Sequence, residues 1–364
     1  MDLFSLIYAF AIFVSFILSL FLTELFRQFA IAHNILDHPH GRKTHKHSTP
    51  LLGGASIFLT FHISLFIIFF LYLFSYDFRE ALPGSSMFNF LGLGSFQKVI
   101  GILSGGVIIF VLGLVDDLTV LNPWVKLAGQ ILSAFLLVCS GIRIEMFYFS
   151  NWILSSLITI AWIVLLTNSL NLLDNMDGLC AGISFICALA FFFCIQPYDE
   201  FLLRLLLMIF AGSVAGFLFH NISPAKIFMG DAGSMFCGFF LSTVGVLGTF
   251  HLEGTPSRVA ILAPVVILSV PLFDTFSVIY LRWKNNQPIM LGDKRHFSHR
   301  LVELGMTSRQ AVEFIWLVGI ISGISALFLP MLSYNFSIFI ILQVLGTYIL
   351  IVLLMNAPKN TNGK

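Results

Sequence analysis

Charge is scarce in this chain: aspartate, glutamate, lysine and arginine make up only 10% of its 364 residues. Hydrophobic residues make up 58%, and the mean hydropathy is +0.96. A water-soluble fold of this size cannot bury so much apolar surface, whereas stacked membrane spans of about 20 apolar residues can. The scarcity of charge therefore argues against a soluble globular protein and predicts an integral membrane protein.

Several other features are missing. The net charge is +1 and no long basic stripe is present, so no nucleic-acid partner is expected. The five cysteines lie in or beside apolar segments without CxxC spacing, which favours small packing residues over disulfides or a metal site. No internal repeat or low-complexity segment is visible. We therefore expect a single membrane domain over residues 1–364.

Long apolar runs fill most of the chain. Windowed hydropathy predicts eleven spans, near residues 3–29, 51–75, 97–115, 124–142, 147–167, 179–196, 202–220, 235–251, 258–281, 311–330 and 335–355. The first is long and no basic segment precedes it, so we expect a span rather than a cleaved signal. Helices are expected, because the bilayer core holds no water to satisfy open backbone groups. The predicted fold is all-α, with about 11 transmembrane helices.

The polar residues gather in five connections between these spans, near residues 30–50, 116–123, 168–178, 221–234 and 282–310. Counted in order, these are the first, third, fifth, seventh and ninth connections, so all lie on one side of the membrane. Fourteen of the 19 lysines and arginines also fall on that side, which the positive-inside rule makes cytoplasmic. We expect an external N-terminus, a cytoplasmic C-terminus and one active site on the cytoplasmic face.

Adjacent carboxylates end the third span. Asp116 and Asp117 repel each other unless a cation lies near them, and Mg²⁺ suits such hard oxygen ligands, although a solvated helix end is the alternative. Lys126 and Gln130 follow at i, i+4 spacing, which places both on one face of the next helix. This spacing predicts that Lys126 pairs with the aspartates or with a substrate phosphate.

Four polar residues recur at intervals of three where the fifth span ends, followed by a glycine that permits a break: Asn168, Asn171, Asp174, Asp177 and then Gly178. The spacing predicts a polar ladder on one side of a helix or tight turn. The alternative, a loop rich in turn formers, explains one or two of these residues better than it explains four.

A third acidic position lies between two glycines. Asp231 follows Gly230 and precedes Gly233, so the backbone there can approach a ligand closely. Phe228 offers a flat face for stacking on a base, and the backbone N–H groups that begin the eighth span are placed to meet phosphate oxygens. The alternative is a plain turn with Asp231 as a helix N-cap.

Basic side chains complete the set and are placed to neutralise phosphate charges: Arg42, Lys43, His45 and His47 in the first connection, and Arg295, His296, His299 and Arg300 in the ninth. The histidine spacing in the first connection fits no common zinc site. Asp274, inside the ninth span, is either functional or a paired structural group. Together these residues suggest phosphoryl transfer from a soluble diphosphate donor to an acceptor dissolved in the bilayer.

In combination the motifs resemble the polyprenyl-phosphate N-acetylhexosamine-1-phosphate transferase family (glycosyltransferase family 4). The resemblance runs from Asp37 to Leu301, through Asp37, Pro39, Arg42, Lys43, His45, Pro50 and Gly53-Gly54, then Asp116-Asp117, Lys126-Leu127 and Gln130, the Asn168-to-Gly178 ladder, Phe228-to-Asp231 with Gly233-Ser234, and His296, His299 and Arg300. The chain departs from the family pattern at Ser48, at Asn175, where glycine is usual, and at Ser298, where the middle histidine is usual. Asn175 is therefore expected to adopt a left-handed conformation.

The resemblance implies Mg²⁺-dependent (or Mn²⁺-dependent) transfer of a sugar 1-phosphate from a UDP-N-acetylhexosamine to undecaprenyl phosphate or a similar polyprenyl phosphate, with release of UMP. It assigns catalytic roles to Asp116, Asp117, Asp174, Asp177, His296 and His299, and substrate binding to Arg42, Lys43, His45, Lys126, Asn168, Asn171, Phe228, Arg295 and Arg300. It assigns metal binding to Asp231, Asp117 and Asn171. A homodimer is left open.

The segment RHFSHRL lacks the three consecutive histidines of the phospho-muramoyl-pentapeptide branch. It looks more like the bacterial branch that starts O-antigen, enterobacterial common antigen or teichoic acid synthesis, where GlcNAc is the commonest sugar. The pentapeptide transferase is the alternative within the family. A transporter or lipid flippase is the alternative outside it, but would place ionisable residues near the bilayer midplane and usually show two related halves.

Overall fold

The computed structural model describes residues 3–37, 48–74, 93–144, 151–195, 200–248, 258–287 and 296–356. Its helices are α1 (Leu3–Ala32), α2 (Gly53–Phe74), α5 (Leu93–Thr119), α6 (Pro123–Cys139), α7 (Trp152–Leu173), α8 (Leu179–Ile195), α9 (Phe201–Asn221), α10 (Gly230–Leu247), η2 (Arg258–Leu262, a 3₁₀ helix), α11 (Ala263–Ile267), α12 (Ser269–Lys284), α13 (Phe297–Glu303), α14 (Ser308–Phe328) and α15 (Tyr334–Met355). Two short strands, β1 (Leu36–Asp37) and β2 (Thr49–Pro50), pair antiparallel.

Within the described residues, eight helices are long and apolar enough to cross a membrane: α1, α2, α5, α7, α9, α10, α14 and α15. The apolar helices α6 and α8 have 17 residues each. Every predicted span overlaps one of these ten helices, except the ninth, which overlaps η2, α11 and α12. The polytopic, helical membrane class is therefore confirmed, whereas eleven spans and the orientation of the termini stay predictions.

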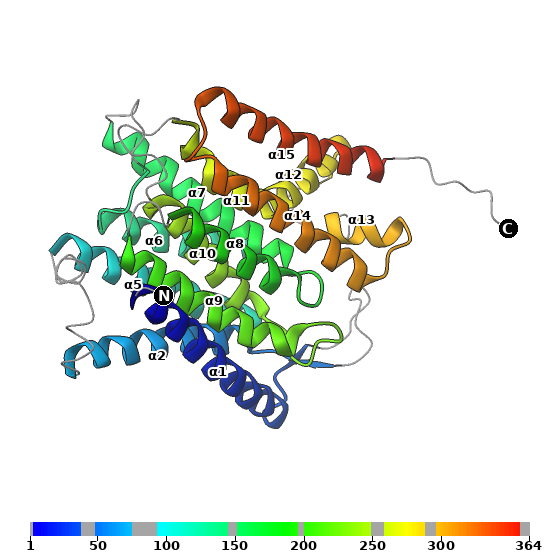
Figure 1. Cartoon of the computed structure of the whole chain (residues 1–364). Coiled ribbons are helices and arrows are strands. Elements are labelled where there is room, and N and C mark those ends of the chain that lie inside the picture. The colour runs from blue at the N-terminus through cyan, green and yellow to red at the C-terminus, as the bar shows by residue number, and fades with distance from the viewer. Residues whose placement is uncertain are drawn as a thin grey trace.

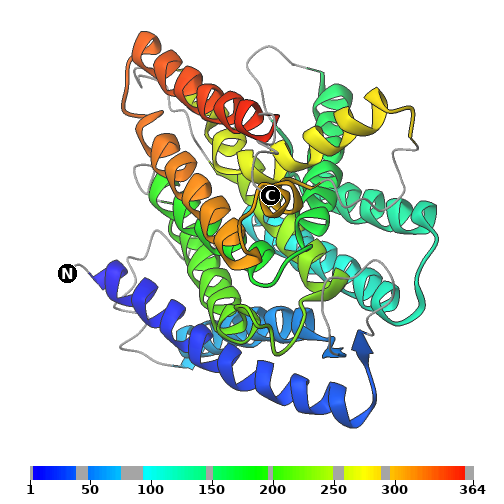
Figure 2. The ribbon, with the colours of Figure 1, turned by 90° about the vertical axis from the view of Figure 1, so that its right-hand side faces the viewer.

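The most buried helices form the centre of the bundle. Helices α8, α9 and α10 lie between α1 and α2 on one side and α14 and α15 on the other (Figures 1 and 2). Gly212 and Gly216, four residues apart on α9, allow close packing against α1, because a Cβ at either position would collide with α1 near Ser15 or Ser19. All five cysteines are free, and the expected packing role is confirmed for the four that are buried, whereas Cys139 is exposed.

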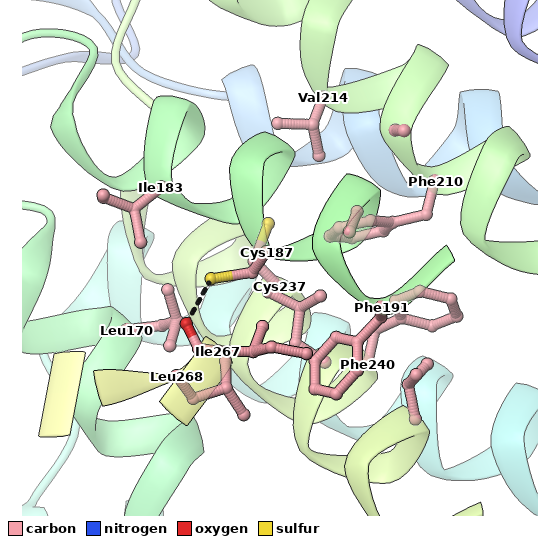
Figure 3. Packing of buried hydrophobic residues seen from close by; sticks show 14 of the residues in the cluster. Leu170, Ile183, Cys187, Phe191, Phe210, Val214, Cys237, Phe240, Ile267 and Leu268 are labelled. Atoms are coloured by element: carbon pink, nitrogen blue, oxygen red, sulfur yellow. Dashed lines mark hydrogen bonds between the residues drawn. The ribbon is translucent and has the colours of Figure 1, made fainter. Parts of the chain in front are cut away.

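The ninth predicted span is broken between α11 and α12. Pro271 has no N–H with which to bond the carbonyl of Ile267, four residues earlier. The thiol of Cys187 on α8 donates to that carbonyl instead, with Sγ and O 3.3 Å apart (Figure 3). The break is thereby satisfied inside the apolar core. Hydropathy alone predicted an unbroken span because it does not register a missing backbone donor.

The helices run further into the polar stretches than predicted. α5 continues to Thr119 and α7 to Leu173, while α10 already begins at Gly230. The predicted connections 116–123, 168–178 and 221–234 are therefore too long. Polar side chains lower the local hydropathy but leave the backbone hydrogen bonds intact, so the chain stays helical where their polar atoms find partners. Most of the candidate residues that the structure describes consequently lie on helices rather than on loops.

The first and seventh connections are joined by their backbones. Phe228 N donates to Pro50 O at 2.8 Å, Gly53 N to Phe228 O at 2.9 Å, and Gly54 N to Met229 O at 2.8 Å. A Cβ at residue 54 would collide with the backbone of Gly233. The two glycines that begin α2 therefore allow it to lie directly against the start of α10.

Candidate active site

Lys126 lies at the centre of a polar cluster formed by the ends of four helices. Its Nζ is 2.8 Å from Asp116 Oδ2 on α5, contacts Asp231 Oδ2 on α10, and is 3.4 Å from Asn171 Oδ1 on α7. The predicted pairing of this lysine is confirmed for Asp116, and the second carboxylate that it contacts is Asp231 rather than Asp117. Residues from the third, fifth and seventh connections thus converge at one end of the bundle.

Asp231 is held from a second direction by α7. The side chain of Asn171 donates through Nδ2 to Asp231 Oδ1 at 2.8 Å and to Ser234 Oγ at 3.0 Å. The carboxylate of Asp231 is therefore oriented by an amide on one oxygen and an ammonium on the other. Ser234 was predicted only as part of a motif, and its role in orienting Asn171 required the structure.

Asp117 caps α10 although it belongs to α5. Its two carboxylate oxygens accept hydrogen bonds from the backbone of Asp231 (2.7 Å) and Ala232 (3.1 Å), and a carboxylate at a helix N-terminus is favourable. Gly230 has a φ of 69°, and a Cβ there would lie 2.5 Å from Asp117 Oδ2. These two N–H groups, predicted to meet phosphate, are therefore occupied by Asp117. Met229, rather than Asp231, is the N-cap residue.

Two further contacts hold Lys126 in place. Asp116 Oδ1 accepts a hydrogen bond from Leu121 N at 2.6 Å, which fixes the turn from α5 into α6. Gln130, one turn beyond Lys126, exchanges two hydrogen bonds with Asn168, at 2.6 and 3.2 Å. The predicted shared face of Lys126 and Gln130 is confirmed, since both side chains reach α7. Asn168 thus aligns α6 with α7 and lies beside the cluster rather than within it.

The loop from α7 to α8 carries Asp174 and Asp177. Burial, together with the nearby charges of Asp231, Asp117 and Asp177, raises the pKa of Asp174 to about 8. Asp177 Oδ2 accepts a hydrogen bond from Ala225 N at 3.0 Å and so holds the segment that precedes α10. The polar ladder therefore contacts α6, α10 and this segment in turn.

The left-handed conformation predicted for Asn175 is wrong. Gly178, with a φ of 75°, makes the reversal instead, and its N–H donates to Asn221 Oδ1 at 2.9 Å. Asn221 also donates to Ile227 O at 2.9 Å, so one side chain joins both connections.

Asp274, on α12, is paired with residues at the start of α13. Its Oδ2 accepts a hydrogen bond from His296 Nδ1 at 2.8 Å and its Oδ1 accepts one from Phe297 N at 2.6 Å. The carboxylate is fully buried, so the structural alternative for Asp274 is the one observed. The ring centroids of His296 and His299 lie 6.3 Å apart.

A hydrogen bond links this region to the end of α7, because Ser298 Oγ donates to Asn175 Oδ1 at 2.6 Å. The fifth and ninth connections therefore also meet. Arg300 lies further out: its Nη2 is 3.4 Å from Asn356 Oδ1, and burial lowers the pKa of its guanidinium. Arg42, Lys43, His45 and Arg295 lie outside the described residues.

The charges of the cluster bear on a metal ion. Among the described residues, no three acidic, histidine or cysteine side chains form a ready set of metal ligands. Yet Asp116 and Asp231 share the ammonium of Lys126, while Asp117, which bonds the backbone of α10, and Asp174 add two further carboxyl groups nearby. The excess of carboxylate oxygen fits Mg²⁺, which commonly binds through one or two carboxylates with substrate phosphates completing its shell.

The chain is similar to known proteins over most of its length. Residues 99–249 match the model of Glycosyl transferase family 4. A probable undecaprenyl-phosphate N-acetylglucosaminyl 1-phosphate transferase of Bacillus subtilis is 33% identical over 339 residues, which cover 91% of this chain and 87% of the relative. A decaprenyl-phosphate N-acetylglucosaminephosphotransferase of Mycolicibacterium smegmatis is 30% identical over a region that covers 84% of this chain and 78% of that relative. A phospho-N-acetylmuramoyl-pentapeptide-transferase of Lactobacillus johnsonii is 28% identical over 85% and 96%. The chain belongs to glycosyl transferase family 4.

Proposed function

We propose that this protein transfers GlcNAc-1-phosphate from UDP-GlcNAc to undecaprenyl phosphate or a similar polyprenyl phosphate and releases UMP. The observation that carries the proposal is the cluster of Asp116, Asp117 and Asp231 around Lys126 at one end of an apolar helical bundle. The printed names of the Bacillus and Mycolicibacterium relatives support both the sugar and the lipid acceptor. The reaction would start a cell-envelope polysaccharide.

The cluster suits phosphoryl transfer because it organises charge at a membrane surface. Asp231 and Asn171, with Asp117 beside them, are the residues that would hold Mg²⁺, which when bound spreads the negative charge of the reacting phosphates. Lys126 balances two carboxylates and is placed to meet a phosphate oxygen when one arrives. Asp116, on the lipid-facing helix α5, is placed to orient or deprotonate the acceptor phosphate.

An apolar groove beside the cluster supports a lipid acceptor. It is lined only by aliphatic side chains of α5, α6 and the turn between them: Val107, Ile108, Val111, Leu112, Val115, Leu121 and Val125. The end of the groove formed by Leu121 and Val125 adjoins the cluster, because Leu121 N bonds Asp116 and Val125 precedes Lys126. An isoprenoid chain lying in this groove would bring its phosphate to Asp116 without leaving the bilayer.

The side of the membrane is part of the proposal. We infer a bacterial plasma-membrane protein with its cluster on the cytoplasmic face, since the lysines and arginines predominate at the predicted connections on that side.

The reaction is tested directly with purified protein, undecaprenyl phosphate, UDP-GlcNAc and Mg²⁺. We expect UMP and a lipid-linked sugar diphosphate, and no product in EDTA. Asp231→Asn should lower kcat by roughly 10²–10³-fold, because it removes charge stabilisation at the reacting centre. Glu313→Gln, which removes an exposed carboxylate on α14, is the matched control and should keep full activity.

Two results would overturn the proposal: full activity of Asp231→Asn, or undiminished turnover in EDTA. A panel of UDP-sugars in the same assay identifies the donor. Turnover of UDP-N-acetylmuramoyl-pentapeptide in preference to UDP-GlcNAc would instead support the activity named for the Lactobacillus relative.

A further inference from the structure

Helix α13 is docked on the end of α7 through one buried hydroxyl. Ser298 is 1% exposed, and its Oγ donates to Asn175 Oδ1 at 2.6 Å. The amide of Asn175 is held at its other end as well, since Nδ2 donates to Leu172 O at 2.9 Å. The bond thus connects a rigid helix end with a buried position on α13, rather than two mobile surface groups.

A second polar anchor holds the first turn of α13. Asp274 on α12 holds His296 and the backbone of Phe297, so residues 296–298 are gripped from α12 on one side and from α7 on the other. Helix α13 has only seven residues, and so short a helix depends on tertiary contacts for its position. Removing either anchor should allow it to shift.

The two residues joined by this bond neighbour candidate site residues. Ser298 precedes His299, and Asn175 follows Asp174. We propose that Asn175 and Ser298 form a positioning pair, which sets the separation between the histidine-bearing turn of α13 and the acidic end of α7. Through that separation the pair tunes affinity for the UDP-sugar. This step rests on the proposed function and on the predicted roles of His299 and Asp174 in it.

The pair also restricts which side chains can occupy the two positions. Because Ser298 is buried against Asn175, a larger side chain at 298 fits only when the side chain at 175 is shortened. These are two of the positions at which the chain departs from the family pattern, with asparagine in place of glycine and serine in place of histidine. The hydrogen bond thus joins two positions at which the chain departs from that pattern.

A double-mutant cycle tests the pair in the purified full-length protein. Ser298→Ala and Asn175→Ala should each raise KM for UDP-GlcNAc about tenfold and change kcat much less, since a buried hydrogen bond is lost while the reacting groups remain. The double variant should be no worse than the worse single one, because either change already breaks the bond. Ser242→Ala, which removes a buried hydroxyl bonded only within α10, should leave KM unchanged.

A size exchange provides the second test. Ser298→His alone should raise KM strongly, and adding Asn175→Gly should restore it to within a few-fold of the wild type. Additive effects in the cycle, an unchanged KM for Ser298→Ala, or failure of Asn175→Gly to rescue would each overturn the positioning role.

Amide hydrogen exchange separates this inference from the proposed function. Exchange across residues 297–303 should quicken in Ser298→Ala and in Asn175→Ala, and no further in the double variant, whatever the substrate. If the wild type did not turn over UDP-GlcNAc, the proposed function would fail while this readout still decided whether the pair docks α13. Unchanged exchange in α13 would overturn the pair itself.

Discussion

Individual side chains of the site each bind more than one partner. One ammonium serves two carboxylates, and one carboxylate, Asp117, serves two backbone N–H groups of another helix. Such contacts make each group depend on its neighbours, so a single substitution is expected to disturb several elements together. Asp174 shows the same dependence through its pKa, which burial and nearby carboxylates raise.

The raised pKa of Asp174 predicts a dependence of stability on pH. Its pKa rises from the usual 3.8 to about 8 on folding, so the folded state favours the protonated acid. The stabilisation is fully present below about pH 4 and is lost as the pH rises towards about 8. In EDTA, the melting temperature of the wild type should therefore fall between pH 5 and 8 more steeply than that of Asp174→Asn. Parallel pH profiles of the two proteins would contradict this prediction.

At the element scale, hydropathy predicted where helices lie but not how they end or break. Every predicted span overlaps a described helix because burial in a bilayer depends on composition over about 20 residues. The break before Pro271 depends on one absent donor and on Cys187, 80 residues away from Ile267. The extension of α7 through Asn168 depends on Gln130, 38 residues earlier. Neither partner can be found from local pattern.

In the candidate site, too, local contacts were predictable from the sequence and contacts between distant segments were not. The i, i+4 spacing correctly placed Lys126 and Gln130 on one face, because helix geometry alone decides that. The bond between Ser298 and Asn175 spans 123 residues of sequence, and the capping of α10 by Asp117 spans 114. Such partners follow from helix packing, which no spacing rule contains.

The close packing of α2 against α10 predicts the effect of adding one methyl group at residue 54. A Cβ at residue 54 would collide with the backbone of Gly233, so Gly54→Ala must push α2 away from the helix that carries Asp231. We expect a loss of roughly 1–3 kcal/mol in unfolding free energy and a clear fall in transfer activity. Thermal unfolding and UMP release measure the two effects.

Gly346→Ala on α15 is the matched control, because nothing lies within 4 Å of a Cβ there. It should keep wild-type activity and be at least as stable as the wild type, because alanine is more favourable than glycine inside a helix. Equal behaviour of the two alanine variants would show that the contact between α2 and α10 does not position Asp231.

For the molecule as a whole, counting the spans predicted that the five polar connections, all odd-numbered, lie on one side of the membrane. The hydrogen bonds agree with it, since they join the first connection to the seventh, the seventh to the third and fifth, and the fifth to the ninth. The orientation of that shared end relative to the two compartments rests on the charge count alone.

Cysteine labelling in intact cells tests the orientation. In a Cys139→Ala background, which removes the exposed native thiol, a membrane-impermeant maleimide should label Ser333→Cys between α14 and α15. It should not label Ser48→Cys, beside β2, until the cells are lysed. The reverse pattern would invert the predicted topology, and labelling of both without lysis would contradict the shared-side assignment of the connections.

The join between the first and seventh connections has a consequence for how this protein tolerates mutation. The three bonds among residues 50, 53, 54, 228 and 229 use only main-chain atoms, so changing a side chain cannot delete them. Proline at 53, 54 or 228 would delete one outright by removing its donor. Side-chain changes at residues 50, 228 and 229 therefore leave every bonding atom of this join in place, whereas residues 53 and 54 have no room for a Cβ, so the start of α10 stays anchored only while both remain glycine.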